Sequence, residues 1–533
     1  MEWEGLMSMQ IFHNGQFVSC EDQNKEFSVL IEDKGKIIFT GDKVPEEYIG
    51  IKKITDLNGK CVVPSFGDTH MHFTSFAMFY STIDVRKATN FDELSDVIND
   101  YIKKNPKEKN ILAFGSSAHT VKEKRLPDRE VLDKITSLPL MIVKYDGHAA
   151  VANSALIKMF PSDVTDDLGF QDETGWLYQN AFYKATEYLT KSISINQVIK
   201  GLSTAANYLA NQGIGLVHAV EGVGFPRDMD IDMIRRVSLA LPQDFRVYFQ
   251  TMDVKKVTKR KMSRIGGCFK NAVDGCFGSE DAALKQPYTN NPENKGVLFY
   301  TQEKVNEFVK EANRAELQVA MHAIGDAAVE QAITAYETAL KDFPRSDHRH
   351  IIIHADLIPE ELLERAAKIN IHLAVQTPFV DWNEEPMEYI ESILGDRADN
   401  LIPIKSMLDH GLTIANGSDA PCTLPNPVKA MHAACNHPNP NQRIDALQAL
   451  RMVTIDAARL SFDENEMGTL TIGKRANFVI LSQNPLNTQI EKIDTIKVEG
   501  LYLDGKKYKS KTHSTGNVLL NTVINRIKGE KLS

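Results

Sequence analysis

Cysteine is sparse in this sequence, and the few cysteines form no recognisable motif. The 533 residues include six, with no C-x-x-C pair among them: Cys20, Cys61, Cys268, Cys276, Cys422 and Cys435. In a chain of this length, such scatter argues against a disulfide framework and indicates reduced thiols in a cytosolic protein.

Long apolar runs, a basic leader and an excess of positive charge are also absent. No run approaches the roughly 18 apolar residues of a transmembrane span. The first four residues, Met1-Glu2-Trp3-Glu4, are acidic, so no signal peptide is expected. The net charge of −10 argues against a general nucleic-acid binder. We therefore expect a cytoplasmic protein that binds neither membranes nor nucleic acid.

What remains is the composition of a large globular protein. Hydrophobic residues make up 42% of the sequence and charged residues 25%, which is typical of a soluble packed chain. Because 533 residues are too many for one ordinary core, two or more folding units are expected.

Both ends of the chain show short strands separated by turn residues. Asn14-Gly15 predicts a two-residue hairpin turn, and Asp33-Lys34-Gly35 predicts a second turn. Near the other end, strands at 478–481 and 496–503 precede the turn pair Asp504-Gly505. These hairpins predict one small β domain that is built from both termini.

Between these ends, apolar strands alternate with helical stretches, a pattern typical of a parallel sheet or barrel. Eight strands are expected, as a (β/α)₈ barrel requires: 62–67, 215–220, 246–251, 268–273, 318–322, 350–354, 372–376 and 412–416. The first two lie too far apart for one crossover, which predicts an inserted subdomain. It would hold strands at 111–114 and 140–143 and a helix at about 194–211. Counting those two strands into the barrel would give ten, which is the alternative.

The predicted fold class is therefore α/β: a (β/α)₈ TIM barrel with an insertion after the first strand, plus a small β-sandwich domain built from both termini. The expected parts are the first half of the β-sandwich (1–60), the first barrel strand (61–89), the insertion (90–205), the remaining barrel strands (206–464), the second half of the β-sandwich (465–512) and a C-terminal helix (513–533). That last helix would dock on the body or on another subunit, so a homodimer is an open alternative.

The first barrel strand leads into two histidines, His70 and His72. A period of two places both imidazoles on the same face of an extended chain, where they could bind one metal ion together. Neutral imidazole suits zinc and other divalent first-row metals. By itself this pair could equally be two polar residues at a strand end.

Three more ligand-type residues stand at the ends of later strands: His322, His354 and Asp419. A histidine in such a place is often a hydrogen-bonded core residue, and Gly-Ser-Asp is often a turn or helix cap. In a barrel, however, the C-terminal ends of the strands meet at one mouth. The five side chains together therefore predict a barrel that binds one or two divalent metal ions.

The sequences of several segments and their order along the chain resemble the motifs of the amidohydrolase superfamily, specifically the YtcJ-like (amidohydrolase 3) group. The resemblance covers about residues 8–510 and rests on PSFGDTHMH (64–72), LPDREVLDK (126–134), DGHAAVANSAL (146–156), FKNAVDG (269–275), MHAIGDAAV (321–329), IIHADLI (352–358), NGSDAPC (416–422) and MGTLTIGKRANFVIL (467–481). It implies a metal-bearing barrel beside a small β domain, with an insertion after the first strand.

The resemblance also implies roles for individual residues. His70 and His72 would hold one metal, and His322 and His354 a second. Lys270 would bridge the two as a carbamate formed with CO₂, since a desolvated lysine reacts as the neutral amine. Glu221, at the end of the second strand, is the substitute bridge if Lys270 is free.

Catalysis would follow from the same resemblance. Asp419 would bind metal and act as the general base, because a metal lowers the pKa of its bound water and makes hydroxide available near neutral pH. A metal or a neighbouring histidine, such as His322, would hold the oxyanion.

Substrate contacts are expected from the insertion and from aromatic residues. His148 and Asn153 match the DGH…NS motif and could reach over the barrel mouth, although a helix-cap turn explains them as well. Gln179 stands where the group often has Glu, which could change substrate preference. Position alone suggests pocket walls that include Trp176, Phe379 and Trp382, while aromatic residues are more often part of a core.

The function expected from these residues is a metal-dependent hydrolase that cleaves a non-peptide C–N bond, an amide or N-substituted formamide, in a small molecule. Zinc is the expected metal. One alternative is a deaminase on the same barrel, with one metal and an unmodified Lys270. Another is a barrel that has lost catalysis and serves as a binding or regulatory protein.

Overall fold

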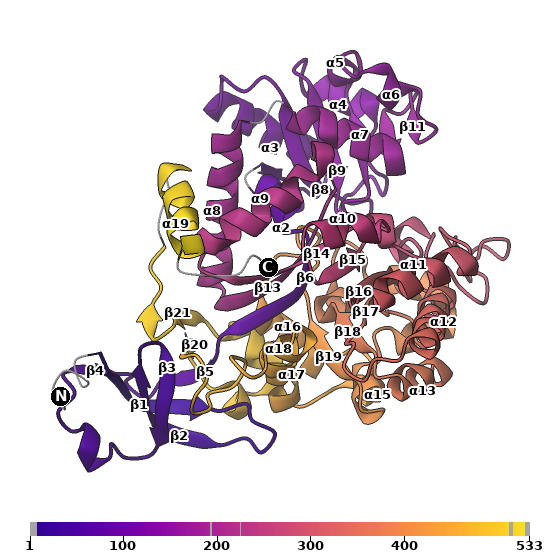
Figure 1. Ribbon diagram of the computed structural model, residues 1–533. Helices are drawn as coiled ribbons and strands as arrows, with labels where there is room; N and C mark the ends of the chain where they lie inside the picture. The colour runs from indigo at the N-terminus through magenta and orange to yellow at the C-terminus, as the bar shows by residue number, and fades with distance from the viewer. Residues whose placement is uncertain (1–7, 81, 192–193, 224, 511–514, 528–533) are drawn as a thin grey trace.

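The computed structural model describes residues 8–80, 82–191, 194–223, 225–510 and 515–527. The acidic start that argued against a signal peptide lies outside these residues, as do positions 513–514 and 528–533 of the predicted C-terminal helix. Figure 1 shows a central barrel, an insertion above it and a small sheet at the opposite end.

The centre of the protein is a parallel barrel of eight strands. In sheet order they are β6 (Phe66–Met71), β13 (Ile214–Glu221), β14 (Asp244–Phe249), β15 (Arg264–Gly267), β16 (Gln318–Ala323), β17 (Ile351–His354), β18 (His372–Val375) and β19 (Thr413–Asn416). These strands are buried almost throughout, because helices cover the outside of a parallel sheet. The first and last strands close the ring through a parallel bridge between Met71 and Ala420 and a hydrogen bond from Asp419 N–H to the His70 carbonyl.

Two of the predicted barrel strands needed correction. The stretch 62–67 is divided between β5 (Cys61–Pro64), which belongs to the terminal sheet, and β6, which begins the barrel. The fourth strand ends at Gly267, and Phe269–Asn271 form a 3₁₀ turn, η4, in place of the predicted strand at 268–273. Gly266 and Gly267 have φ of 115° and 131°, so the chain leaves the extended conformation there.

Helices surround the barrel, and most of their buried apolar residues belong to the main hydrophobic core. They are α2 (Phe73–Phe79), α8 (Ile195–Asn211), α9 (Met229–Val237), α10 (Val254–Lys259), α11 (Gln302–Arg314), α12 (Asp326–Asp342), α13 (Glu360–Lys368), α14 (Met387–Leu394), α15 (Ile404–Asp409), α16 (Pro427–Cys435), α17 (Ala446–Met452) and α18 (Ile455–Leu460). The predicted helix at 194–211 is confirmed as α8. Its start carries a complete capping box between Ser194 and Gln197.

The insertion has a six-stranded sheet of its own, so the ten-stranded barrel is excluded. Its elements are β7 (Ile83–Asp84), α3 (Phe91–Lys104), β8 (Ile111–Ser116), α4 (Arg129–Ile135), β9 (Leu140–Lys144), β10 (Ala149–Ala152), α5 (Ser154–Ile157), α6 (Ser162–Thr165), β11 (Phe170–Gln171), β12 (Trp176–Tyr178) and α7 (Gln179–Thr190). The turn between β9 and β10, which contains Asp146 and His148, reaches the barrel mouth.

The two ends of the chain form one eight-stranded sheet. It contains β1 (Gln10–Val18), β2 (Glu26–Asp33), β3 (Lys36–Gly41), β4 (Lys53–Asp56), β5, β20 (Phe478–Leu481), β21 (Val498–Leu503) and β22 (Lys506–Lys507). The antiparallel pairing of β20 with β5 joins the two halves. Figure 1 shows this sheet at the end of the molecule away from the insertion.

One predicted turn in this sheet is not a turn. Strand β1 continues past Asn14-Gly15 without reversing direction. Asn14 has φ of 56°, and the register with β2 shifts at this point. The pair therefore makes a β-bulge, which uses the same left-handed conformation as a hairpin turn. The turns at Asp33-Lys34-Gly35 and Asp504-Gly505 are confirmed, since each joins two paired antiparallel strands.

A last helix, α19 (Thr515–Ile527), packs beside α8 and α9, with Val518 buried in the main core. Among the described residues, no helix combines the length and the apolar character needed to cross a bilayer.

Candidate metal centre and active site

Side chains that can bind a metal stand at the ends of four barrel strands. His70 lies on β6 and His72 directly follows it, His322 lies on β16, and His354 ends β17. Asp419 follows β19. His354 and Asp419 have positive φ values of 74° and 52°, an uncommon conformation that concentrates at functional sites. The ends of these strands share one rim of the barrel.

The ligand atoms form two overlapping groups that share His70. In the first, Asp419 Oδ1 lies 3.1 Å from His70 Nε2 and 3.4 Å from His72 Nε2. In the second, Cys268 Sγ lies 3.3 Å from His70 Nε2 and 3.7 Å from His354 Nε2. Within each group the ligand atoms lie within 4.8 Å of one another, and all five residues are buried.

His322 lies beside these groups and differs in orientation. Its ring centroid is 4.5 Å from that of His354, and its Nε2 lies 3.0 Å from the Gly275 carbonyl. A carbonyl only accepts, so the hydrogen is on Nε2, and Nδ1 carries a lone pair. That Nδ1 is buried with no hydrogen-bond partner in the described part of the chain. With its lone pair free, His322 Nδ1 can bind a metal. It carries no hydrogen and therefore cannot donate to an oxyanion.

The charge states fit metal binding. Burial lowers the pKa of His322 to about 3 and that of His354 well below its usual value, which leaves both imidazoles neutral. Burial also lowers the pKa of His72, although Asp419 opposes this shift. Burial alone would raise the pKa of Asp419, but the neighbouring histidines hold it well below its usual range, so this carboxyl is ionised.

The buried polar atoms test whether a metal fits. Asp419 Oδ1 and His322 Nδ1 are buried without a hydrogen-bond partner among the residues described. The same holds for Nδ1 of His70 and of His354, the ring nitrogens other than the Nε2 atoms that face Cys268. Leaving so many polar atoms unsatisfied is costly, and a divalent cation would satisfy the carboxylate and a histidine lone pair at once. Burial and the charge of Asp419 raise the pKa of the Cys268 thiol, but a bound metal would deprotonate it. The residues present therefore fit a divalent metal.

The structure does not bring Lys270 into this group. It lies on η4 with its side chain half exposed, and its Nζ donates to the Gly222 carbonyl at 2.8 Å and lies 4.0 Å from Asp228. Glu221, the substitute bridge, accepts a hydrogen bond from Thr74 N–H at 3.0 Å and is in neither group of ligand atoms. The residue that stands where a bridge was expected is Cys268.

We expect Cys268→Ala to lower the metal content by about one equivalent per chain and the hydrolytic rate at least about 10-fold, because a ligand whose sulfur faces both His70 and His354 is lost. Lys270→Ala is the matched comparison and should leave metal content unchanged and the rate within about 3-fold. Elemental analysis of the purified variants measures the first effect. Loss of metal in Lys270→Ala with full metal in Cys268→Ala would contradict this prediction and support Lys270 as the bridging ligand.

Three of the predicted substrate contacts line the cavity next to the ligand groups. His148 does so from the insertion, with its ring centroid 6.5 Å from that of His322. Phe379 and Trp382 line it from the segment after β18. The cavity has a volume of about 40 Å³.

The other three lie elsewhere in the insertion. Asn153 is buried and hydrogen-bonded on all sides: its Oδ1 accepts from Leu156 and Leu140 N–H, and its Nδ2 donates to two carbonyls. Asn153 is the N-cap of helix α5, which is the alternative explanation given above for its motif. Trp176 packs in the core of the insertion, and Gln179 is exposed at the start of α7. None of the three lines the cavity at the metal centre.

Several residues of the site were missed by the sequence reasoning. Cys268 follows two glycines, which mark a strand end and could have placed it at the mouth. Asp356 lies two residues after His354, within the IIHADLI segment that carries the resemblance. Asp146 opens the DGHAAVANSAL segment, in which only His148 and Asn153 were given a role, and Glu385 gave no sequence signal, because only the folded chain brings it to this cavity.

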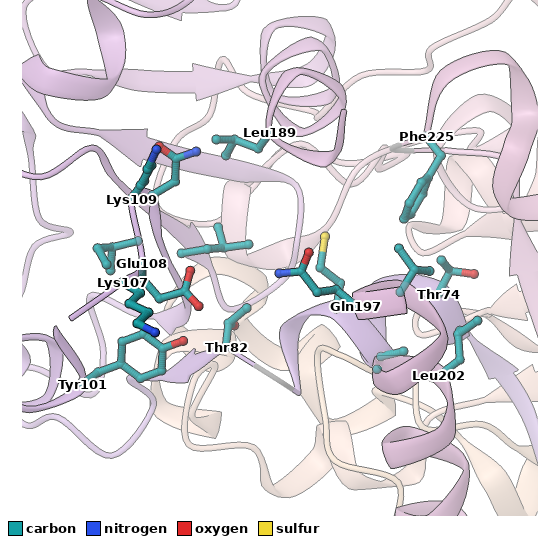
Figure 2. Close-up of a pocket in the computed structure, with 17 residues that line it drawn as sticks. Thr74, Thr82, Tyr101, Lys107, Glu108, Lys109, Leu189, Gln197, Leu202 and Phe225 are labelled. Carbon is teal, nitrogen blue, oxygen red and sulfur yellow. The ribbon is translucent and has the colours of Figure 1, made fainter. Parts of the chain in front are cut away.

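A larger cavity of about 410 Å³ lies between the insertion and helices α2 and α8. Figure 2 shows Tyr101 and Lys107 on one side of it and Leu202 and Phe225 on the other. None of the predicted metal ligands lines it, so its size does not make it the reaction site.

Comparison with known proteins identifies the class to which this barrel belongs. The sequence profile of the amidohydrolase family matches residues 53–507. The chain belongs to the amidohydrolase family, and the resemblance seen in its motifs is confirmed at this level.

Relatives match over nearly the whole chain. "Protein LONG AFTER FAR-RED 3" of Arabidopsis thaliana is 28% identical, covering 94% of this chain and 92% of that protein. An N-substituted formamide deformylase of Arthrobacter pascens is 25% identical over 85% of this chain and 89% of that enzyme. An uncharacterized metal-dependent hydrolase of Pyrococcus horikoshii shares the fold with a TM-score of 0.73 at 24% identity, over 91% of this chain and 99% of that one.

Proposed function

We propose that this protein is a metal-dependent hydrolase that cleaves a non-peptide C–N bond, an amide or N-substituted formamide, in a small molecule. The observation that carries the proposal is the pair of ligand groups that share His70, with the ionised Asp419 in one of them. The formamide deformylase among its relatives supports the substrate class.

In this proposal two divalent metal ions would be held, one by His70, His72 and Asp419 and the other by Cys268 and His354, with His322 as a further ligand through Nδ1. When bound, a divalent metal such as zinc polarises the substrate carbonyl and makes hydroxide available near neutral pH. Asp419 accepts the proton of the attacking water and passes it to the nitrogen that leaves. The C–N bond breaks, and the products are a carboxylate, formate from a formamide, and an amine.

The surrounding residues exclude water and position the substrate. His148 closes the cavity from the insertion, with its Nδ1 held 2.8 Å from the Asp146 carbonyl and its ring against Phe269. Phe379 and Trp382 offer flat apolar surfaces for the part of the substrate that does not react.

The test is an assay of metal-loaded protein on N-substituted formamides, acetamides and amino-substituted heterocycles. We expect release of formate or acetate with the amine, loss of this activity after chelation, and recovery on addition of zinc. Ammonia release from the heterocycles without amide hydrolysis, together with one metal per chain, would favour the deaminase. Protein that holds no metal and turns over no compound would favour a binding or regulatory barrel.

A further inference from the structure

One arm of the cavity beside the metal centre is both acidic and aromatic. Asp356 and Glu385 line it together with Phe379 and Trp382. Both carboxyl side chains belong to nearly buried residues, 4% and 9% exposed. Neither is part of the metal-ligand groups described above.

Within the described part of the chain, neither carboxyl group forms an ion pair with a basic side chain, since the nearby Lys144 pairs with Asp146. Asp356 Oδ1 has no hydrogen-bond partner among the residues that the structure describes. Glu385 accepts a hydrogen bond from the Tyr145 hydroxyl at 2.7 Å, and its charge is the neighbouring one with the largest electrostatic effect on Asp356. The two carboxyl groups therefore share one small, poorly solvated space.

The nearby Lys144 forms its ion pair with a third acidic residue, Asp146. Lys144 lies 2.7 Å from Asp146 Oδ2, and both side chains are buried. The same ammonium also donates to the Gly278 carbonyl at 3.2 Å and to Ser279 Oγ at 3.0 Å. Its ion pair is with Asp146, and its charge also favours the ionised form of Glu385, whereas Asp356 has no basic partner among the described residues. Burial raises the pKa of Glu385 to about 7. An arriving positive charge would stabilise the ionised carboxylates.

The aromatic rings give the arm a flat wall. Phe379 stacks on Trp382 with centroids 4.6 Å apart and planes 8° apart, and it lies nearly parallel to His354 at 6.2 Å. Tyr145 meets Trp382 edge-on at 5.1 Å. This row of rings leads from the metal centre to Glu385, and aromatic faces attract cations.

We propose that this arm binds a positively charged nitrogen group, an ammonium, amidinium or guanidinium, carried on a planar part of the substrate. The reacting compound would then be an acylated amine that has a second, basic nitrogen. This substrate class rests on the proposed function, whereas binding of the cation depends on the arm alone. An anion would be repelled by ionised carboxyl groups, and a neutral group without a hydrogen-bond donor would leave Asp356 Oδ1 buried without a partner.

The experiment compares three probes of the same shape on the metal-loaded protein by isothermal titration calorimetry: benzamidine, benzamide and benzoate. We expect benzamidine to bind at least about 10-fold more tightly than benzamide, since charge-assisted hydrogen bonds to carboxylates are the strong ones. Asp356→Asn and Glu385→Gln should each weaken benzamidine binding about 10-fold and leave benzamide binding within about 2-fold. Asp381→Asn, an exposed carboxylate of the same segment, should change neither.

Equal affinity for benzamidine and benzamide, or tighter binding of benzoate, would overturn the inference. So would the loss of a metal equivalent in Asp356→Asn or Glu385→Gln, because the two carboxyl groups would then belong to the metal site. These binding results do not depend on turnover. If benzamidine binds as expected and no amide is hydrolysed, the proposed reaction fails and the cation site stands.

Discussion

Replacing Asp419 with asparagine is expected to lower kcat/KM for amide hydrolysis by about 10³-fold. General acid–base catalysis contributes roughly 10²–10⁴-fold, and an asparagine amide cannot accept the proton of the attacking water. The residue keeps its shape, and its backbone hydrogen bond to the His70 carbonyl does not involve the side chain. A steady-state assay together with elemental analysis of the variant measures both effects.

Metal content decides which role of Asp419 is lost. If Asp419→Asn keeps its full metal content and loses activity, Asp419 acts as the base. If the variant loses metal, Asp419 acts as a metal ligand. Asp409→Asn, at the exposed end of α15, is the matched control and should behave like the unmodified protein. An Asp419→Asn protein with full metal and an unchanged rate would remove Asp419 from the mechanism.

Replacing His70 with alanine is expected to abolish metal binding and, with it, activity. His70 Nε2 faces Asp419 in one ligand group and Cys268 in the other, so a single substitution breaks both. His72→Ala should be milder, because the group of His70, Cys268 and His354 is left intact. The measurements are metal content and the melting temperature with and without a chelator.

A bound metal stabilises the folded state by mass action, so chelation should lower the melting temperature of the unmodified protein and leave that of His70→Ala unchanged. His410, which pairs with Glu360 on the outside of the barrel, gives the control substitution to alanine. Retention of all metal in His70→Ala would show that the two groups do not form a metal centre.

The meeting of His70, His322, His354 and Asp419 at one rim of the barrel could be predicted because barrel geometry links a residue's position in the sequence to its place in the fold. A residue at the C-terminal end of a barrel strand lies at the mouth wherever it falls in the chain. His70, His322, His354 and Asp419 all follow apolar strands whose positions in the sequence were found within a few residues. The eight-stranded barrel and the separate insertion followed from the same pattern.

Cys268 and Lys270 show where that reasoning stops. A strand over 268–273 would place both side chains on the same face, since the period is two. The strand ends at Gly267, and the 3₁₀ turn that follows breaks this period. Cys268 therefore faces the histidines while Lys270 points to Gly222. A shift of strand end by a few residues reverses which side chain enters the site.

The roles of residues in the insertion were harder to predict, because a short motif there can serve local structure, such as a helix cap or a core contact, as well as a binding site. Asn153 satisfies its own helix start, and Trp176 fills the core of a small sheet. The acidic arm was not predicted, because Asp356 lies in a segment that was interpreted only through His354, and Glu385 belongs to no motif.

The ring of strands is closed between its first and last members, at the bridge from Met71 to Ala420, and the proposed ligands stand on both sides of this seam. A nascent chain released only as far as α15 has His70, His72, Cys268, His322 and His354 but lacks Asp419 and the strand that joins β6. Assembly of the centre must therefore await synthesis of the last barrel strand. Any protein shortened before that point would have neither a sealed barrel nor the proposed base, however well its earlier segments fold.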